Sequence, residues 1–166
     1  TAKSAPVFGG VYKLAAVEDE QGNIIPKIKI SENTAKITNP HYKKLYRFYD
    51  NESGKALAYE LCVYDETIDS TKPHTIFDPD AIWKTKTLTD YTARELHVTV
   101  FKNGELVYKQ PSLYEIRIYC AEQLETLWDE VKRFENPHTY YVDLSKKLWD
   151  IKNALLEKSK DGKDLK

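Results

Sequence analysis

The stretch RELHVTVFKNGELVYKQPSLYEIRIYCAEQLETLWDEVKRF, residues 94–134, decides the fold class, because the spacing of its apolar residues changes part-way along. In residues 94–109, apolar and polar residues alternate on both sides of Asn103-Gly104. Alternation around Asn-Gly is typical of two strands joined by a type I′ turn. After Ser112 the apolar residues recur every three or four positions, which is the period of an amphipathic helix. Strands followed by helices predict an α+β fold.

Two C-terminal amphipathic helices are predicted. The first covers residues 112–134, and Ser112 with Glu115 forms a capping-box pattern at its start. The sequence ENPH at 135–138 is expected to end it, and a second helix is expected over about residues 143–157. Each helix should bury one apolar face against the rest of the domain. The residues on these two faces are Ile116, Cys120, Leu124, Leu127, Val131 and Phe134, then Leu144, Leu148, Ile151 and Leu155.

Antiparallel hairpins are predicted for the part of the chain that precedes the helices. Turn residues separate alternating runs, and Gly54 is expected to take the left-handed position of one hairpin loop. Residues 66–80, which contain two prolines, are expected to form a loop. Strands and helices do not alternate along the chain, so the sequence does not predict a parallel sheet. The predicted strands before residue 94 are 9–18, 25–31, 42–50 and 56–65.

Composition limits the classes of function. The 166 residues are 41% hydrophobic and 31% charged, with a net charge of -1. Nucleic-acid-binding proteins usually carry an excess of basic residues, so a nucleic-acid partner is not expected. No apolar run is long enough for a membrane span, and no signal-peptide pattern opens the chain, so a cytoplasmic location is expected. Cys62 and Cys120 lack metal spacing and are expected to be buried thiols. The four histidines are scattered, and no metal ligands are predicted. The absence of methionine favours a segment of a longer protein.

A candidate anion site lies in the first predicted hairpin. Gly9 and Gly10 would allow the backbone to approach a phosphate closely, and lysine supplies a positive charge. Lys13 follows Gly10 by three residues, while Lys27 and Lys29 alternate with isoleucines and would share one face of their strand. A bend at the glycines with exposed lysines on ordinary strand faces explains the same pattern equally simply. These residues alone leave both interpretations open.

At these residues the sequence resembles a known family. GGVYKLAAVED, IPKIKISENTAKITNP, ARELHVTVFKNGELVY and PSLYEIRIYCAEQLETLWDEVKRFENPHTYYVDLS look like segments of the C-terminal portion of bacterial nicotinate phosphoribosyltransferase. The likeness extends over residues 7–156 in the family's order. Several collinear segments are more specific than any single motif among them.

The resemblance implies an enzyme that joins nicotinate to phosphoribosyl pyrophosphate. The products are nicotinate mononucleotide and pyrophosphate, ATP hydrolysis drives the reaction, and the step commits nicotinate to NAD synthesis. It further implies ATP and magnesium as requirements of the intact enzyme, an irregular α/β barrel as its catalytic core, and a homodimer. The family's catalytic residues match no position of this chain, so the chain alone is expected to be inactive and to bind no cofactor. A stand-alone, non-catalytic interaction module is the alternative.

The resemblance also bears on particular residues and on domain limits. Gly9, Gly10 and Lys13 stand in the family's GGVYK segment and Lys29 in its KIKIS segment, which implies substrate phosphate binding by these four residues. His41 departs from the glycine that often follows TNP in the family, which puts a left-handed backbone there in doubt. The expected division is residues 1–40 as strands completing a preceding domain, 41–158 as a C-terminal α+β domain, and 159–166 as a disordered tail.

Overall fold

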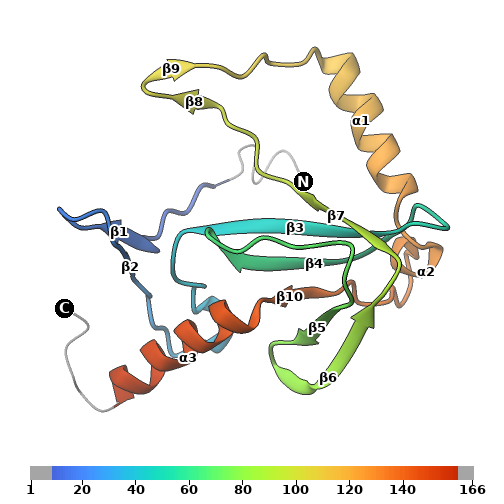
Figure 1. Ribbon diagram of the computed structural model, residues 1–166. Helices are drawn as coiled ribbons and strands as arrows, with labels where there is room; N and C mark the ends of the chain where they lie inside the picture. The colour runs from blue at the N-terminus through green and yellow to red at the C-terminus, as the bar shows by residue number, and fades with distance from the viewer. Residues whose placement is uncertain (1–8, 161–166) are drawn as a thin grey trace. The chain divides into compact units, whose positions relative to one another are not determined.

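The structure is a computed structural model that describes residues 9–160. The chain divides into two compact units, one formed by residues 1–42 and 150–166 and the other by residues 43–149 (Figure 1). Each unit is described by itself below. The domain limits expected from the sequence stay a prediction. Among the described residues, no helix has the length and apolar character needed to cross a membrane.

The first unit contains a short antiparallel hairpin, in which β1 (Ala16–Glu18) pairs with β2 (Ile24–Pro26). The turn between them is held by the carboxylate of Asp19, which accepts hydrogen bonds from the backbone of Gln21 and Asn23 at 2.9 and 2.8 Å. Hydrogen bonds to this carboxylate lower the pKa of Asp19, and the one from the Asn23 side chain has the largest effect, followed by the backbone bonds. The hairpin was predicted, but its strands are three residues long rather than 9–18 and 25–31. A 3-10 turn, η1 (Thr34–Lys36), follows.

His41 has a left-handed backbone, with φ of 79°. The doubt raised by the absence of glycine at this position was therefore wrong. Histidine tolerates this region better than bulky or β-branched residues do. Its N–H donates to the Ala15 carbonyl at 2.8 Å, and its Nδ1 accepts from the Tyr42 N–H at 3.0 Å, and these bonds help to hold the backbone in this conformation.

The second unit is built on a four-stranded sheet with the order β10-β4-β3-β7. Gly54, in the loop between β3 and β4, has a φ of 67°, which confirms the left-handed position predicted there. The pairing of β10 with β4 is parallel, whereas the sequence had predicted antiparallel hairpins and a helix beginning near residue 143. The bounds are β3 (Lys43–Asp50), β4 (Ala56–Val63), β7 (Tyr91–Glu95) and β10 (Val142–Leu144).

A second hairpin packs on one face of this sheet. It consists of β5 (His74–Asp78) and β6 (Ala81–Leu88), so the loop predicted over residues 66–80 was wrong from His74 onward. The buried residues come from alternate positions of β3 and β4 and from the facing hairpin, as the period of two requires. They form one apolar cluster of Tyr46, Phe48, Ala58, Cys62, Ile76, Leu88 and Tyr91.

The first C-terminal helix is shorter than predicted. The capping box is confirmed: Ser112 Oγ accepts from the Glu115 N–H, and the Ser112 N–H donates to the Glu115 carboxylate at 2.6 Å. However, α1 (Leu113–Glu125) ends where the Lys55 ammonium donates to the Glu125 and Leu127 carbonyls, and a one-turn helix, α2 (Asp129–Lys132), follows. A lysine at these free carbonyls also opposes the helix dipole favourably.

The apolar face of α1 is not buried in this unit. None of its residues is buried, and the predicted core positions Leu124 and Phe134 are 50% and 100% exposed. Cys120 is also exposed, so the expectation of two buried thiols holds only for Cys62. The expected burial was wrong because a periodic apolar face indicates that a helix has a partner without indicating which segment supplies it.

The last helix, α3 (Lys146–Lys160), starts after β10 rather than at Asp143. Ser145 is its cap, and its Oγ accepts from the Leu148 N–H at 3.2 Å. Leu148 is fully buried. The disordered tail was expected to begin at Ser159, but Ser159 and Lys160 are helical, and residues 161–166 lie outside the described part of the chain.

The hairpin around Asn103-Gly104 is confirmed, with strands of two residues each, β8 (Phe101–Lys102) and β9 (Glu105–Leu106). The φ angles of 52° and 83° at Asn103 and Gly104 are both positive, as a type I′ turn requires. The fold is therefore α+β with antiparallel hairpins, as predicted, to which the structure adds one parallel strand pair. The α/β barrel implied for the rest of the enzyme stays a prediction.

Candidate functional site

The two glycines of the predicted anion site precede β1 and are exposed. Neither has a positive φ, and a Cβ added to Gly9 or Gly10 would meet no atom within 4 Å. Within the described part of the chain, nothing therefore requires glycine at either position. The close approach of a backbone to a phosphate stays a prediction that concerns the intact protein.

The lysines of the predicted site lie outside the strands. Lys13 precedes β1, and its ammonium lies 3.5 Å from the Lys36 carbonyl oxygen. Lys29 follows β2, and its backbone N–H donates to Thr38 Oγ1 at 3.2 Å. The expectation that Lys27 and Lys29 share a strand face was wrong, because β2 ends at Pro26. All of these residues belong to the first unit, and their role in phosphate binding is not tested by this geometry.

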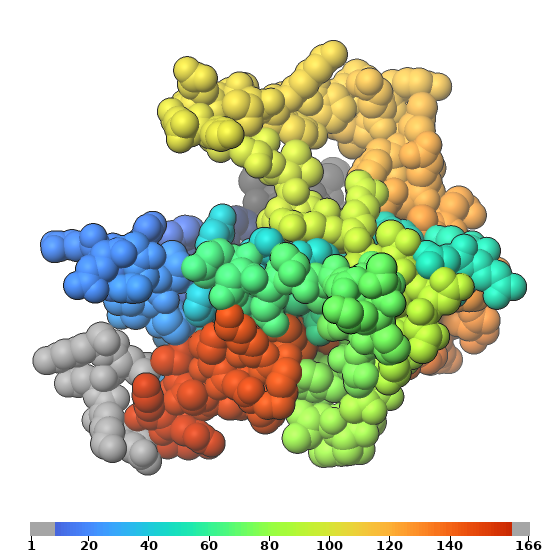
Figure 2. Space-filling model, viewed as in Figure 1, coloured from blue at the N-terminus to red at the C-terminus, as the bar shows by residue number. Residues whose placement is uncertain are grey.

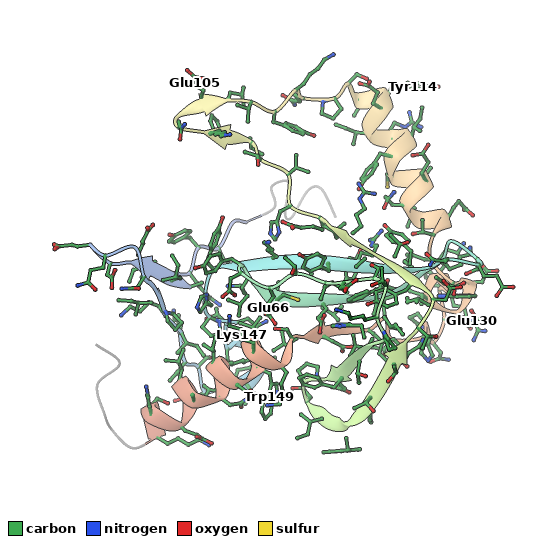
Figure 3. The ribbon with its side chains drawn as sticks, viewed as in Figure 1. Glu66, Glu105, Tyr114, Glu130, Lys147 and Trp149 are labelled. Atoms are coloured by element: carbon green, nitrogen blue, oxygen red, sulfur yellow. The ribbon has the colours of Figure 1, made fainter. Side chains whose placement is uncertain are left out.

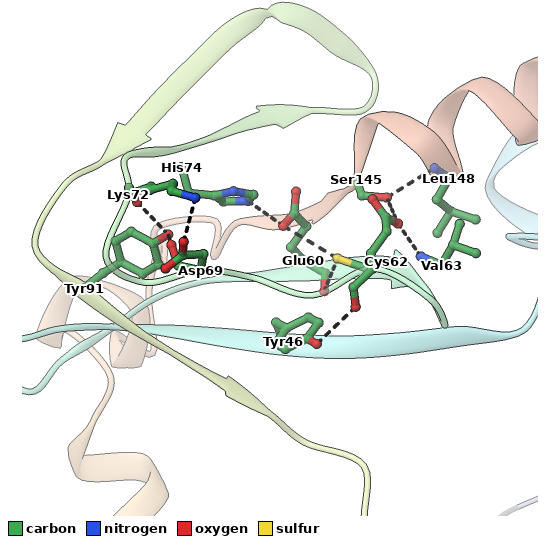
Figure 4. A network of polar contacts seen from close by, with 11 residues as sticks. Tyr46, Glu60, Cys62, Val63, Asp69, Lys72, His74, Tyr91, Ser145 and Leu148 are labelled. Carbon is green, nitrogen blue, oxygen red and sulfur yellow. Dashed lines mark hydrogen bonds and ion pairs between the residues drawn. The ribbon is translucent and has the colours of Figure 1, made fainter.

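Buried polar groups gather instead between the sheet and the β5–β6 hairpin (Figure 4). Glu60, on β4, is 2% exposed and lies 2.7 Å from His74 Nε2 on β5. The His74 ring also stacks on Phe48 at 5.2 Å and is tilted toward Tyr91 at 6.3 Å. The pair therefore fastens the hairpin to the sheet inside an aromatic surrounding.

A second buried carboxyl lies directly beside Glu60. Asp143 on β10 is the register partner of Glu60 and is 3% exposed. Burial raises the pKa of Asp143 to about 6, and the charges of Glu60 and Asp78 act in the same direction. Burial, followed by the charges of Glu60 and Glu66, raises the pKa of the Cys62 thiol well above its usual range. Cys62 thus behaves as a small apolar residue rather than a nucleophile.

The start of α3 is joined to β4 by Glu66. Its carboxylate accepts from Ser145 Oγ at 2.7 Å and from the Val63 N–H at 2.6 Å (Figure 4). Nearby, the Lys147 ammonium pairs with Asp65 at 2.6 Å. Figure 3 places Glu66 and Lys147 in the region where the helix begins. Glu66 and Lys147 therefore meet protein partners on this side of the sheet, which indicates a structural role for both.

No metal site is found here. Among residues 9–160, no group of three or more His, Cys, Asp or Glu side chains is arranged to hold a metal ion. A groove of about 300 Å³ beside α2 is lined by aromatic residues that include Trp128 and Tyr141, with the Lys86 ammonium 5.9 Å from the Tyr141 ring. Burial raises the pKa of Tyr140, in the same groove, to about 12, so its hydroxyl would not serve as a base near neutral pH.

The opposite face of the sheet carries charged groups that the sequence did not single out. Arg47 on β3 and Arg94 on β7 are register partners, so their side chains lie next to each other on one face. They line a groove of about 550 Å³ together with residues of α1. Arg47 donates to Gln123 Oε1 at 2.8 Å and lies 4.5 Å from the Tyr59 ring centroid. The only hint in the sequence is an arginine within each alternating run, and their pairing is visible only once the register is known.

Comparison with known proteins identifies the chain. A family model described as the nicotinate phosphoribosyltransferase C-terminal domain matches residues 42–152, about two thirds of the chain. The chain belongs to this family. The family predicted from GGVYK and the later segments is therefore confirmed, and the family is one of enzymes.

Individual relatives agree with the family match. The nicotinate phosphoribosyltransferase of Bacillus subtilis (strain 168) is 37% identical over 152 residues, which cover 92% of this chain and 31% of that protein. The nicotinate phosphoribosyltransferase of Dictyostelium discoideum is 30% identical over 173 residues, which cover all of this chain and 28% of that protein. The chain thus spans less than a third of the length of these relatives.

A solved structure supports the fold. The crystal structure of human nicotinic acid phosphoribosyltransferase matches with a TM-score of 0.64 at 25% identity, over 72% of this chain and 24% of that chain. The α+β arrangement found here is therefore similar to part of a nicotinate phosphoribosyltransferase of known structure.

Proposed function

We propose that this chain is the C-terminal part of a nicotinate phosphoribosyltransferase. The intact enzyme forms nicotinate mononucleotide and pyrophosphate from nicotinate and phosphoribosyl pyrophosphate with ATP hydrolysis, the first step of NAD synthesis from nicotinate. The match of the C-terminal domain family over residues 42–152 carries this proposal. The collinear identity of 37% to the Bacillus subtilis relative supports it.

The chain's own contribution to this reaction is a framework rather than a catalytic centre. Glu60 and Asp143 are buried and Glu66 is half-buried, and the carboxylates of Glu60 and Glu66 meet protein groups rather than an open cleft. Phosphoribosyl transfer needs charges positioned around a pyrophosphate and its metal. We infer that ATP, magnesium and the reacting groups of the substrates bind to the remainder of a cytoplasmic homodimer, that this chain adds at most edge residues to the site, and that the 166-residue chain alone is inactive.

The direct test is formation of nicotinate mononucleotide by the purified product of the intact gene. Product that depends on nicotinate, phosphoribosyl pyrophosphate and ATP would support the proposal. Absence of product from a folded, intact protein would contradict it and favour the stand-alone interaction module. Activity of the 166-residue chain above a heat-inactivated control would contradict only the inference that catalysis belongs to the part of the intact enzyme outside this chain.

The phosphate-binding role of Gly9, Gly10, Lys13 and Lys29 belongs to this proposal. Lys13 is exposed, and its ammonium contacts only a carbonyl oxygen among the described residues, so it can turn toward an anion at little cost. In the intact enzyme, Lys13→Ala should raise the Michaelis constant for phosphoribosyl pyrophosphate more than that for nicotinate. Loss of one charge-assisted hydrogen bond is worth about 1.5–3 kcal/mol, or roughly 10- to 150-fold.

A matched control is available in the same unit. Lys36→Ala removes an exposed lysine side chain but keeps the backbone carbonyl that Lys13 contacts. It should leave both Michaelis constants unchanged. If Lys13→Ala behaves like Lys36→Ala while the fold is retained, Lys13 is an ordinary exposed lysine and the phosphate site is wrong.

A further inference from the structure

Residues 98–122, here called the arm, have local structure but no core. The arm contains β8, β9 and most of α1, and none of its residues is buried. An isolated two-stranded hairpin and a 13-residue helix are each marginal in water. Exposed apolar side chains on this scale mark an interaction surface. They are Val98, Val100, Phe101, Leu106, Val107, Leu113, Tyr114, Ile116, Ile118 and Tyr119.

The arm is nevertheless held at both ends. At its start, the Leu96 N–H donates to the Leu45 carbonyl at 2.9 Å, and the Leu45 N–H donates to His97 Nδ1 at 3.3 Å. At its end, the Lys55 ammonium holds the last carbonyl of α1 at 2.8 Å. Figure 2 shows the yellow and orange arm standing apart from the green strands between these anchors, and in Figure 3 Glu105 and Tyr114 mark its outer edge. The anchors make the arm a defined surface of the second unit.

The arginine pair under α1 has no acidic partner among residues 9–160. Like charges directly opposite each other on neighbouring strands are destabilising, and Arg47 and Arg94 are such a pair. Arg47 Nε is buried without a hydrogen-bond partner, which costs free energy. Neither arginine forms an ion pair with an acidic group of residues 9–160. A carboxylate placed between them would remove both costs, since the guanidinium fork matches a carboxylate in geometry.

The groove around these arginines defines the rest of the occupant. Its volume is about 550 Å³, and apart from the arginines, Gln123 and Cys120 it is lined by apolar or aromatic side chains. The apolar surface continues along the arm to Leu113 and Tyr114, which are 75% and 72% exposed and lie outside the groove. A small anion would fill only part of such a surface. A polypeptide segment with apolar side chains and one acidic side chain would cover it.

We propose that the arm and the Arg47–Arg94 groove dock the larger, preceding part of the same polypeptide, which places an Asp or Glu carboxylate between the two arginines. This inference rests on the proposed function, because it takes the chain to be the C-terminal part of a longer enzyme. The family match is to a C-terminal domain, and the chain covers only 31% and 28% of two full-length relatives. Most of the polypeptide is therefore available to supply the segment.

The first experiment maps the occupant in the full-length protein. Tyr119, which lines the groove, is replaced by the photocrosslinker benzoylphenylalanine in a mixture of unlabelled and 15N-labelled copies. The expected product joins residue 119 to an acidic segment that precedes Thr1 within one copy. The same replacement at Trp83, an exposed residue of β6 outside the arm, should give no such product. Crosslinks between differently labelled copies, or none at residue 119, would overturn the proposal.

The second experiment tests the charge. In the full-length protein, Arg94→Glu should increase hydrogen exchange of α1 amides about tenfold, as loss of one charge-assisted bond implies. Arg117→Glu makes the same charge change on α1 outside the groove and should leave exchange unchanged. Replacing the crosslinked carboxylate by lysine should restore protection to Arg94→Glu. If Arg94→Glu and Arg117→Glu behave alike, the arginine pair is not the docking contact. Neither readout uses enzymatic activity, so failure of the proposed reaction would be seen separately.

Discussion

The buried carboxyl of Asp143 should make the stability of the second unit depend on pH. Burial raises its pKa from 3.8 to about 6. Because the folded-state pKa lies above the unfolded value, the folded state binds the proton more tightly between these two pH values. The stabilisation from this proton is fully present below about pH 4 and is lost as the pH rises through about 6.

The size of the effect follows from the pKa difference. A difference of roughly two pKa units, at 1.36 kcal/mol per unit, corresponds to about 3 kcal/mol. Asp143→Asn keeps the size and shape of the side chain but cannot titrate. The free energy of unfolding of Asp143→Asn, measured relative to that of the wild type, should therefore rise by up to about 3 kcal/mol between pH 4 and pH 7.

Urea denaturation of both proteins at intervals across this pH range measures the difference. Titrations of groups that do not interact with Asp143 affect both proteins equally and cancel. Asp80→Asn is the matched control, because Asp80 is an exposed acid in the same unit, and its difference from wild type should stay flat. A flat difference for Asp143→Asn as well would refute the buried position of this carboxyl beside Glu60.

Three further changes test the fold. Leu148→Ala should lower the free energy of unfolding by about 2–5 kcal/mol, because Leu148 is fully buried. Leu124→Ala in the 166-residue chain should lower it far less, because Leu124 is half exposed. Equal losses of unfolding free energy in denaturation experiments would contradict this difference in burial. Ser112→Ala should destabilise the start of α1 by about 1 kcal/mol, seen as faster hydrogen exchange in its first turn and unchanged exchange in α3. Gly54→Ala, at φ 67°, should cost about 1–2 kcal/mol, and a neutral result would show that the loop after β3 can adopt another conformation.

Local signals in the sequence predicted local structure well. The type I′ turn at Asn103-Gly104 and the capping box at Ser112 are fixed by residues two or three positions apart, and both are present. Gly54 likewise marks its own turn. Each feature depends on the backbone preference or the hydrogen-bonding capacity of the residues that form it, so no knowledge of distant segments was needed.

Features that depend on distant partners were not predicted. The strand β10 has three residues, and it pairs with β4, more than 80 positions earlier, through Val142 and Tyr59. Its Leu144 was assigned to the following helix, because Leu144 is in phase with Leu148. Only Ser145, which caps α3, separates the two elements, and a serine next to a lysine-rich helix start is a weak boundary.

The candidate sites follow the same division. The predicted phosphate site assumed that Lys13 and Lys29 lie on two long strands, whereas both lie outside the short strands β1 and β2, so the phosphate-binding role itself stays a prediction. The Arg47–Arg94 pair was missed because nearly 50 residues separate its members, and the register of β3 with β7 brings them together. Sequence alone indicated neither arginine, since an arginine in an alternating strand is usually a solvated residue.

The two faces of the sheet differ in how completely the described chain satisfies them. On one face, Glu60 finds His74, and Phe48 lies in an apolar cluster, so that the second unit's own elements complete this side. On the other face, Arg47, the residue next to Phe48 on β3, has a buried Nε–H without a hydrogen-bond partner and is the register partner of Arg94 on β7. Since buried polar groups in native proteins are almost always paired, the missing partner is expected in the part of the protein that lies beyond this chain. The docking that we propose gives the sheet two different roles: one side packs against the C-terminal domain's own elements, and the other would pack against the preceding part of the polypeptide.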